Sequence, residues 1–140
     1  MSRLIRIFPA QLQAFDQIRA LVDEFGAMSN LGREDRHKLT LIVEELFTNT
    51  VAHGHQGDSD APVSISFEHD KGEMELIYED SAPAFDPLAG GERTDINSAI
   101  KERKVGGLGI LITVGLTERA SYSYVDGRNR ICLRLSVSGN

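Results

Sequence analysis

Residues 39–54 read LTLIVEELFTNTVAHG, and this stretch decides how the rest of the chain is interpreted. As a helix, it turns one set of side chains toward one side with the period of a packed apolar face, namely Leu39, Ile42, Val43, Leu46 and Thr50. Glu45, Asn49 and His53 are spaced four apart, so they form one row along the edge of that face. Such a polar row beside a core indicates a functional site. Glu44 points about 100° away at ~3.6 residues per turn and is predicted to be an ordinary surface acid.

Composition predicts one globular domain over residues 1–140, because 41% of the side chains are hydrophobic and 26% are charged. The formal net charge of −6 argues against nucleic acid or an anionic membrane as the main partner, since both attract a basic surface. The sequence contains no apolar run of about 18 residues and no signal-peptide pattern. We therefore expect a soluble cytoplasmic protein.

Apolar periodicity predicts the remaining elements. The expected strands are 3–8, 63–69, 74–80, 120–126 and 129–137, and the expected helices are 10–28, 33–54 and 110–117. Leu12 and Phe15 on the first helix could serve the core or a dimer interface, and the core is preferred. The helices come in a group, and the strands pair as hairpins, one turning at Asp70-Lys71-Gly72 and the last around Gly127. This order predicts an α+β, two-layer sandwich with helices on one face of a mixed, mostly antiparallel sheet.

Residues 81–105 have few apolar side chains, and we interpret them as a lid over a site, because long irregular segments in small domains are usually functional. A basic cluster lies near the end of the lid, and a glycine-rich turn at 106–109 follows it. Each feature also has an ordinary explanation. The basic residues could form a solvated face, the glycines could only permit a turn, and Asp80 could only cap one. The basic cluster consists of Lys101, Arg103 and Lys104.

Together these features fit the binding of Mg²⁺–ATP. A glycine-rich turn entering a helix presents backbone N–H groups to phosphate, and an asparagine oxygen such as that of Asn49 can coordinate Mg²⁺. Glu45 could accept a proton from an attacking hydroxyl, and Asp80 could accept a hydrogen bond from an exocyclic amine and so select adenine. The P-loop, eukaryotic kinase and dinucleotide signatures are absent from the sequence, and its histidines lack the partners of a zinc site.

Three short motifs occur in order along the chain. They are ELFTN at 45–49, DSAPAFDP at 80–87 and GGLGI at 106–110. In this order and spacing they resemble the N, G1 and G2 boxes of the GHKL (Bergerat-fold) ATPases, the histidine kinase-like ATPase domains. Within that superfamily the chain most resembles the small bacterial anti-sigma-factor serine kinases, and the resemblance covers nearly its whole length.

The resemblance implies a role for each matching residue. Asn49 would be the Mg²⁺ ligand, Glu45 the general base and Asp80 the acid that reads the adenine amino group. His53 would either approach the phosphates or only help to end the helix, and the second is preferred. The remaining expected nucleotide contacts are Ala82, Ala84, Phe85, Lys101, Arg103, Lys104, Gly106, Gly107, Leu108 and Gly109.

The resemblance also implies partners and leaves two functions open. Kinases of this family transfer the γ-phosphoryl group of ATP to a serine of an anti-anti-sigma factor, hold a sigma factor inactive and commonly form homodimers. Glu45 and Asn49 favour this function. The alternative is a partner-switching module that binds ATP, or no nucleotide, and transfers nothing. The G1 box leaves room for it, because this chain has Ala82 where glycine is usual and alanine lacks easy access to positive φ.

Overall fold

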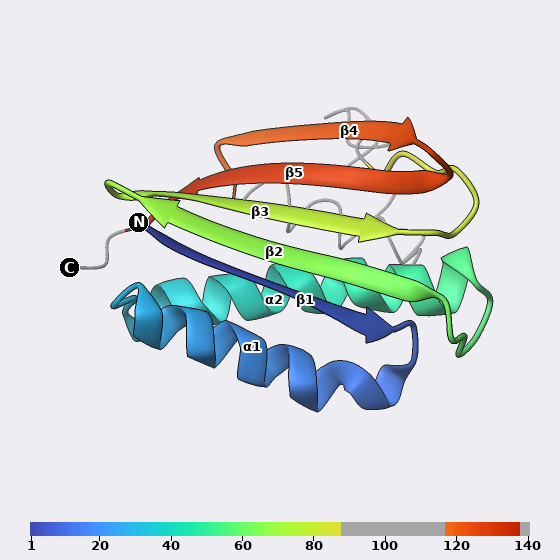
Figure 1. Cartoon of the computed structure of the whole chain (residues 1–140), viewed down its shortest axis with the longest axis horizontal. Helices are drawn as coiled ribbons and strands as arrows, with labels where there is room; N and C mark the ends of the chain where they lie inside the picture. Colours follow the sequence, from blue (N-terminus) through green and yellow to red (C-terminus); the bar gives the residue numbers. More distant parts are fainter. Residues whose placement is uncertain (88–116, 138–140) are drawn as a thin grey trace, which may run out of the picture.

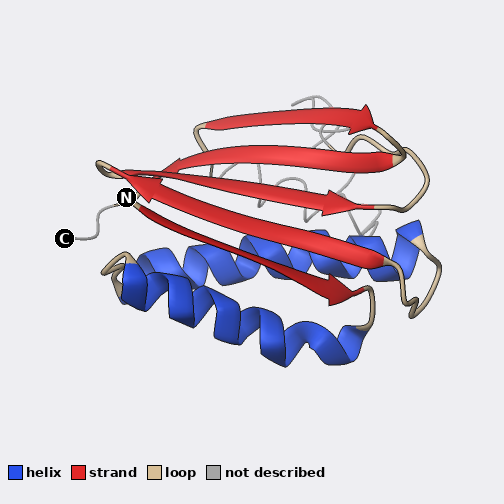
Figure 2. Ribbon diagram, viewed as in Figure 1, coloured by secondary structure: helices blue, strands red, loops and turns tan. Residues whose placement is uncertain are grey.

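The computed structural model describes residues 1–87 and 117–137, and in these ranges five strands form a single sheet covered on one face by two α-helices (Figures 1 and 2). The strand order is β1-β2-β3-β5-β4. The elements are β1 (Ser2–Pro9), a 3-10 turn η1 (Leu12–Ala14), α1 (Phe15–Met28), α2 (Arg33–Asn49), a π-helical turn η2 (Thr50–Gly54), β2 (Pro62–Asp70), β3 (Glu73–Asp80), β4 (Arg119–Val125) and β5 (Arg128–Ser136).

The predicted α+β sandwich is confirmed. All four strand pairings among the described residues are antiparallel, so the parallel pairing that a mixed sheet would contain does not occur there. Helices α1 and α2 lie side by side beneath the sheet in Figure 1. Of the expected helix at 110–117, all but the last residue lies outside the described residues.

Two tight turns set the register of the sheet. Lys71 and Gly72 have φ values of 50° and 81°, and Asp126 and Gly127 have values of 53° and 76°. Positive φ at both positions of a two-residue turn matches the twist of the flanking strands. The resulting register places Asp80 at the end of β3 directly opposite Asn129 on β5, which brings two polar side chains to one end of the sheet.

The core lies between the sheet and the helices. Phe25 of α1 stacks on Phe67 of β2 with ring centroids 5.1 Å apart, and Phe15 meets the edge of Phe47 at 5.2 Å. The alternation predicted for the strands is confirmed, because the inward positions are buried. These positions are Val63, Ile65, Phe67, Met74, Leu76, Tyr78, Ile131, Leu133 and Leu135.

The helix predicted from residue 10 begins later, and Leu12 is not in the core. Helix α1 starts at Phe15, and Leu12 in the preceding turn η1 is 47% exposed. The cause is a tertiary contact: the backbone N–H of Leu12 donates to Asp58 Oδ1 at 3.0 Å, so the loop before β2 holds this segment out of α-helical phase.

The helix predicted over 33–54 keeps α geometry only to Asn49. Thr50–Gly54 form a π turn, in which the N–H of His55 donates to the carbonyl of Thr50 at 2.9 Å, five residues back. A π turn changes the direction in which the following side chains point, and such turns are frequent at functional sites. Asn49 and His53 nevertheless remain on one side, because both line the pocket described below.

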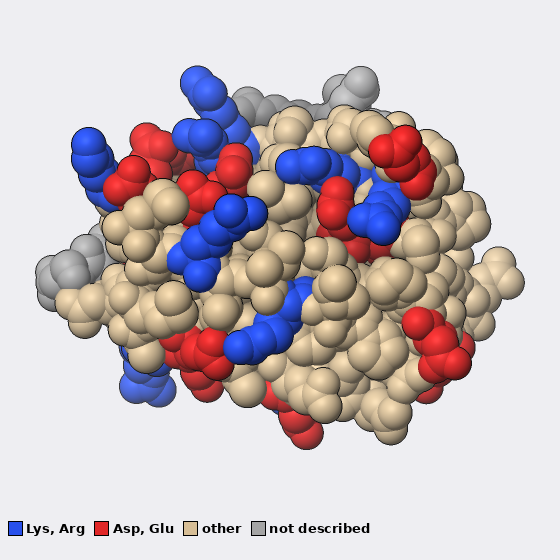
Figure 3. Space-filling view, viewed as in Figure 1, with Lys and Arg blue, Asp and Glu red and all other residues tan. Residues whose placement is uncertain are grey.

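The surface carries both signs of charge. On the face seen in Figure 3, acidic and basic side chains alternate and do not gather by sign. Among the helices described, none is long and apolar enough to cross a membrane.

Candidate functional site

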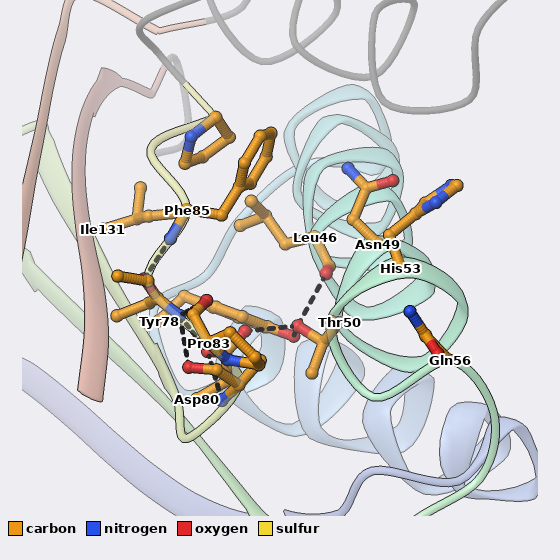
Figure 4. Close-up of a pocket in the computed structure, with 15 residues that line it drawn as sticks. Leu46, Asn49, Thr50, His53, Gln56, Tyr78, Asp80, Pro83, Phe85 and Ile131 are labelled. Atoms are coloured by element: carbon orange, nitrogen blue, oxygen red, sulfur yellow. Dashed lines mark hydrogen bonds between the residues drawn. The ribbon is translucent and has the colours of Figure 1, made fainter. Parts of the chain in front are cut away.

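A pocket of about 450 Å³ opens between the end of α2 with η2 and the ends of β3 and β5 (Figure 4). In Figure 4, Asn49 and His53 lie on the helical side, and Phe85 and Ile131 lie opposite them. The residues that line the pocket are Leu46, Asn49, Thr50, His53, Gly54, Gln56, Tyr78, Asp80, Ala82, Pro83, Ala84, Phe85, Pro87, Asn129 and Ile131.

The pocket brings together many of the residues that the sequence singled out. Those present in its lining are Asn49, His53, Asp80, Ala82, Ala84 and Phe85. Glu45 lies on α2 one turn before Asn49 and is not part of the lining formed by the described residues. Outside the described residues lie Lys101, Arg103, Lys104, Gly106, Gly107, Leu108 and Gly109, with the lid from residue 88 onward.

The prediction that Glu44 is an ordinary surface acid is confirmed by its ion pair. Its Oε1 accepts from Arg19 of α1, with an Nη2–Oε1 distance of 2.7 Å. This ion pair links α2 to α1, and neither of its residues is part of the pocket lining.

Asp80 lies at the floor of the pocket, where its side chain is held by three donors from the described residues. Oδ2 accepts from the hydroxyl of Thr50 at 2.7 Å, and Oδ1 accepts from Asn129 Nδ2 at 2.8 Å and from the backbone N–H of Ala82 at 3.2 Å. The bond to Ala82, two residues along the chain, is the turn cap that was the ordinary explanation for Asp80. Asp80 therefore caps a turn and also faces the pocket.

Thr50 was expected on the apolar face of the helix, but it belongs to the site. Its Oγ1 lies 2.6 Å from the hydroxyl of Tyr78, and complete burial raises the pKa of that phenol well above its usual range. Tyr78 is thus protonated and donates to Thr50, whose own hydrogen goes to Asp80 Oδ2 at 2.7 Å in preference to the more distant Leu46 carbonyl at 3.0 Å. A directed chain of hydrogen bonds ends on the carboxylate.

Asn129 is a second functional residue that the sequence reasoning missed. It is 5% exposed, and its Nδ2 lies 2.8 Å from Asp80 Oδ1, 3.0 Å from the Ala82 carbonyl and 3.1 Å from the Pro83 carbonyl. Its Oδ1 accepts from the N–H of Phe85 at 3.0 Å and from the Tyr122 hydroxyl. A signal was available, because Asn129 is a polar residue in phase with the inward apolar positions of its strand.

Asn49 contributes an unpaired oxygen to the pocket. Its Oδ1 is buried and has no hydrogen-bond partner within residues 1–87 and 117–137. A buried acceptor without a partner costs free energy, so a ligand that satisfies it gains affinity. Among the same residues, no three acidic, histidine or cysteine side chains are placed to hold a metal by themselves. A cation at Asn49 would therefore need further ligands from beyond these residues, such as a bound molecule and water.

Ala82 replaces the glycine of the G1 box without backbone strain. The non-glycine residues with positive φ in the described ranges are Asn30, Gln56, Lys71 and Asp126, so Ala82 has an ordinary negative φ. Its methyl group points at Gly54, where an added Cβ would lie only 2.7 Å from Ala82 Cβ. An alanine on one wall of the pocket is thus matched by a glycine on the other.

Gly54→Ala is expected to weaken nucleotide binding about 10-fold and to lower the free energy of unfolding by about 1–3 kcal/mol, because two methyl groups cannot share this space. Gly54→Ala with Ala82→Gly should recover most of both losses, which calorimetric binding and thermal unfolding would measure. The control is Gly32→Ala, where an added Cβ meets nothing within 4 Å. A double variant no better than Gly54→Ala would contradict the pairing.

The fold and this pocket define an α+β domain with a buried acid, Asp80, whose carboxylate is positioned to accept a hydrogen bond from a polar ligand. The chain belongs to the family of histidine kinase-like ATPase domains, which its sequence matches over residues 8–135. The resemblance to the GHKL ATPases is thereby confirmed, and ATP is the ligand that the family implies. No protein of curated function matches the sequence.

Solved structures with the same fold include bacterial regulators. The RsbU and RsbW domains of Rv1364c from Mycobacterium tuberculosis align with a TM-score of 0.69 and 16% identity, covering 98% of this chain and 33% of that one. The histidine kinase AdeS of Acinetobacter baumannii aligns with a TM-score of 0.51 and 16% identity, over 99% and 70% of the two chains. The catalytic domain of histidine kinase ThkA gives 0.53 and 9%, over 98% and 99%. These identities show a shared fold only, and the chain spans about a third of the mycobacterial structure.

Proposed function

We propose that the protein is an ATP-dependent serine kinase that phosphorylates an anti-anti-sigma partner and holds a sigma factor inactive. The observation that carries the proposal is the pair of unfilled acceptors in one pocket, on Asp80 and on Asn49. An acceptor at the floor suits the amino group of adenine, and an unpaired amide oxygen on the helical wall suits the metal that accompanies the phosphates. Shared fold with a structure that contains an RsbW domain supports the regulatory role.

Asn49 fits a magnesium site because its Oδ1 is buried and unpaired by any described residue. Asn49 would hold Mg²⁺ through this oxygen, with the remaining ligands from nucleotide phosphates and water, and the bound cation would neutralise charge on the transferred group. His53, on the same wall, would lie near the phosphates. In this arrangement the described residues supply one ligand, Asn49.

Glu45 would act as the general base. It lies four residues before Asn49, about 6 Å along the helix at ~1.5 Å per residue, and outside the pocket lining of the described residues. A base at the edge of a nucleotide pocket, and not inside it, can meet a serine hydroxyl that arrives from another protein. It would take the hydroxyl proton as the serine oxygen attacks the γ-phosphorus, while the bond from that phosphorus to the oxygen bridging to the β-phosphate breaks and ADP leaves.

The alternative is a module that binds ATP and switches partners without phosphoryl transfer. Its support is the position of Glu45, which does not line the pocket in the described part of the chain. Ala82 no longer favours it, because the alanine is accommodated opposite Gly54 with an ordinary backbone.

The decisive experiment is a transfer assay. The purified chain is mixed with Mg²⁺–ATP and candidate anti-anti-sigma domains, and each domain is then analysed by mass spectrometry for a phosphorylated serine. A substrate with that serine changed to alanine is the control. We expect transfer to one serine. ATP binding without transfer to any domain would contradict the kinase and support the switching module.

The proposal also names partners and a setting. The sigma factor and the anti-anti-sigma factor would compete for the chain in the cytoplasm, with no direct contact to nucleic acid. A homodimer of single-domain chains is expected from the family resemblance, and light scattering of the purified chain measures it.

Asn49→Ala should remove the dependence of ATP binding on Mg²⁺ and weaken binding in the presence of Mg²⁺ by about 10-fold, since the metal loses the ligand proposed for it among the described residues. Titration calorimetry with Mg²⁺ and with a chelator measures both effects. The matched control is Thr48→Ala, an adjacent residue of α2 outside the described pocket lining, which should behave as the parent does. An unchanged metal dependence in Asn49→Ala would rule out its ligand role.

A further inference from the structure

We propose that Asn129 is a positioning residue that makes the pocket select adenine over guanine, by occupying one of the two oxygens of Asp80. The proposal deepens the nucleotide-binding part of the proposed function and does not depend on phosphoryl transfer. It rests on the contacts of two buried side chains, Asp80 and Asn129, which face each other across β3 and β5.

The first step is a count of the acceptor positions on Asp80. A carboxylate has about four lone-pair positions, two on each oxygen. Oδ1 receives Asn129 Nδ2 and the N–H of Ala82, so both of its positions are taken. Oδ2 receives the hydroxyl of Thr50. Among the donors in the described residues, this leaves one open position, and it is on Oδ2.

The second step is the orientation of the Asn129 amide, which its surroundings determine. The side of the amide assigned as Nδ2 meets three acceptors, namely Asp80 Oδ1 and the carbonyls of Ala82 and Pro83. The side assigned as Oδ1 meets two donors, the N–H of Phe85 and the hydroxyl of Tyr122. A reversed amide would set acceptors against a carboxylate and donors against donors. Asn129 therefore presents N–H groups toward Asp80.

The third step compares the two purines. Adenine offers one amino group beside a ring acceptor, so a single open position on Oδ2 suffices. Guanine offers two adjacent donors, N1–H and the 2-amino group, which pair with a carboxylate through both of its oxygens. Because Oδ1 is filled, the 2-amino group would meet the N–H groups of Asn129 and Ala82 and stay unpaired. A buried donor without an acceptor lowers affinity by about 10- to 100-fold.

Asn129 has a second effect that an experiment must separate from selectivity. Its contacts to the carbonyls of Ala82 and Pro83 and to the N–H of Phe85 hold the segment that forms one wall of the pocket. Loss of these bonds would weaken the binding of every nucleotide by a similar factor. The informative quantity is consequently the ratio between two nucleotides that differ only in the 2-amino group.

The test measures the affinities of ATP, ITP and GTP for the purified full chain by displacement of a fluorescent ATP analogue. ITP has the guanine ring without the 2-amino group, so the ratio of GTP to ITP isolates that group. For the parent chain, we expect GTP to bind at least about 10-fold more weakly than ITP. Equal or tighter binding of GTP would overturn the proposal without any variant. A chain that binds no ATP would instead overturn the nucleotide site itself, and the proposal with it.

Two variants of Asn129 then identify the responsible side chain. Asn129→Ala opens the space beside Asp80 Oδ1, so the affinity for GTP relative to that for ITP should rise by about 10-fold or more. Asn129→Leu removes the same hydrogen bonds but keeps the volume filled, so the ratio of GTP to ITP affinity should not rise. Both variants should bind ATP more weakly than the parent chain. Tyr122→Phe, which removes only a donor to Asn129 Oδ1, should keep the parental ratio.

Affinities are compared only for variants that are folded, which circular dichroism and thermal unfolding establish for each one. If Asn129→Ala and Asn129→Leu change all three nucleotides by one common factor, Asn129 only supports the pocket wall and the proposal fails. If neither variant folds, the ratio of GTP to ITP on the parent chain decides alone.

Discussion

Glu45→Gln is expected to slow phosphoryl transfer by about 100- to 10,000-fold while leaving ATP affinity within about twofold of the parent. Glutamine keeps the shape of the side chain but cannot accept a proton from the serine hydroxyl. Because Glu45 is outside the described lining of the nucleotide pocket, its loss should not disturb binding. Single-turnover transfer with saturating Mg²⁺–ATP measures the rate, and calorimetry measures the affinity.

The chain offers a matched control in the neighbouring residue. Glu44→Gln makes the same chemical change one position earlier, where the carboxylate pairs with Arg19 at an Nη2–Oε1 distance of 2.7 Å and does not line the pocket. We expect a parental transfer rate and at most a small loss of stability, since this pair is partly exposed to solvent. If Glu45→Gln transfers phosphate at the parental rate, Glu45 is not the general base. The same conclusion follows if Glu44→Gln slows transfer as much as Glu45→Gln does.

Asp80→Asn is expected to lower ATP affinity by at least about 100-fold. The substitution removes the charge that orients Thr50 and Asn129, and it sets an amide against groups that need an acceptor. The adenine amino group loses its partner at the same time. Titration calorimetry with Mg²⁺–ATP measures the loss, and thermal unfolding should show reduced stability, because four polar side chains converge on this floor.

The control for Asp80→Asn is Glu79→Gln on the same strand. Glu79 points to the opposite face of the sheet and lies 3.8 Å from Arg130, so its change should leave ATP affinity at the parental level. If a folded Asp80→Asn binds ATP with parental affinity, the adenine ring does not bind at Asp80. Selection of adenine by Asn129 would then also lose its basis.

Much of the fold was predictable because it depends on local interactions. The apolar period before Asn49 predicted α2, and the two-residue turn at Lys71 and Gly72 predicted the β2–β3 hairpin, since each signal lies within one element. The burial of alternate strand residues followed from the same patterns. Where a distant contact intervened, the prediction was wrong, as at Leu12, which Asp58 holds outside α1.

The candidate site was predictable in part, and the division has a physical cause. Asn49 and Asp80 could be singled out because motifs within short segments carry them. Thr50 and Asn129 could not, since the role of each depends on a partner far away in the chain. Thr50 reaches Asp80 thirty residues later, and Asn129 reaches it across forty-nine residues.

The amino-acid sequence by itself determined the order of helices and strands, the three motifs and the identity of the acid at the end of β3. These depend on periodicity and residue type, which are properties of neighbouring residues. The tertiary structure alone decided which lone pairs of Asp80 are filled, that Gly54 makes room for Ala82, and that Thr50 donates to Asp80 at the pocket floor. Those features depend on distances between separate elements, and hydrogen-bond geometry and close packing are set only when the elements meet.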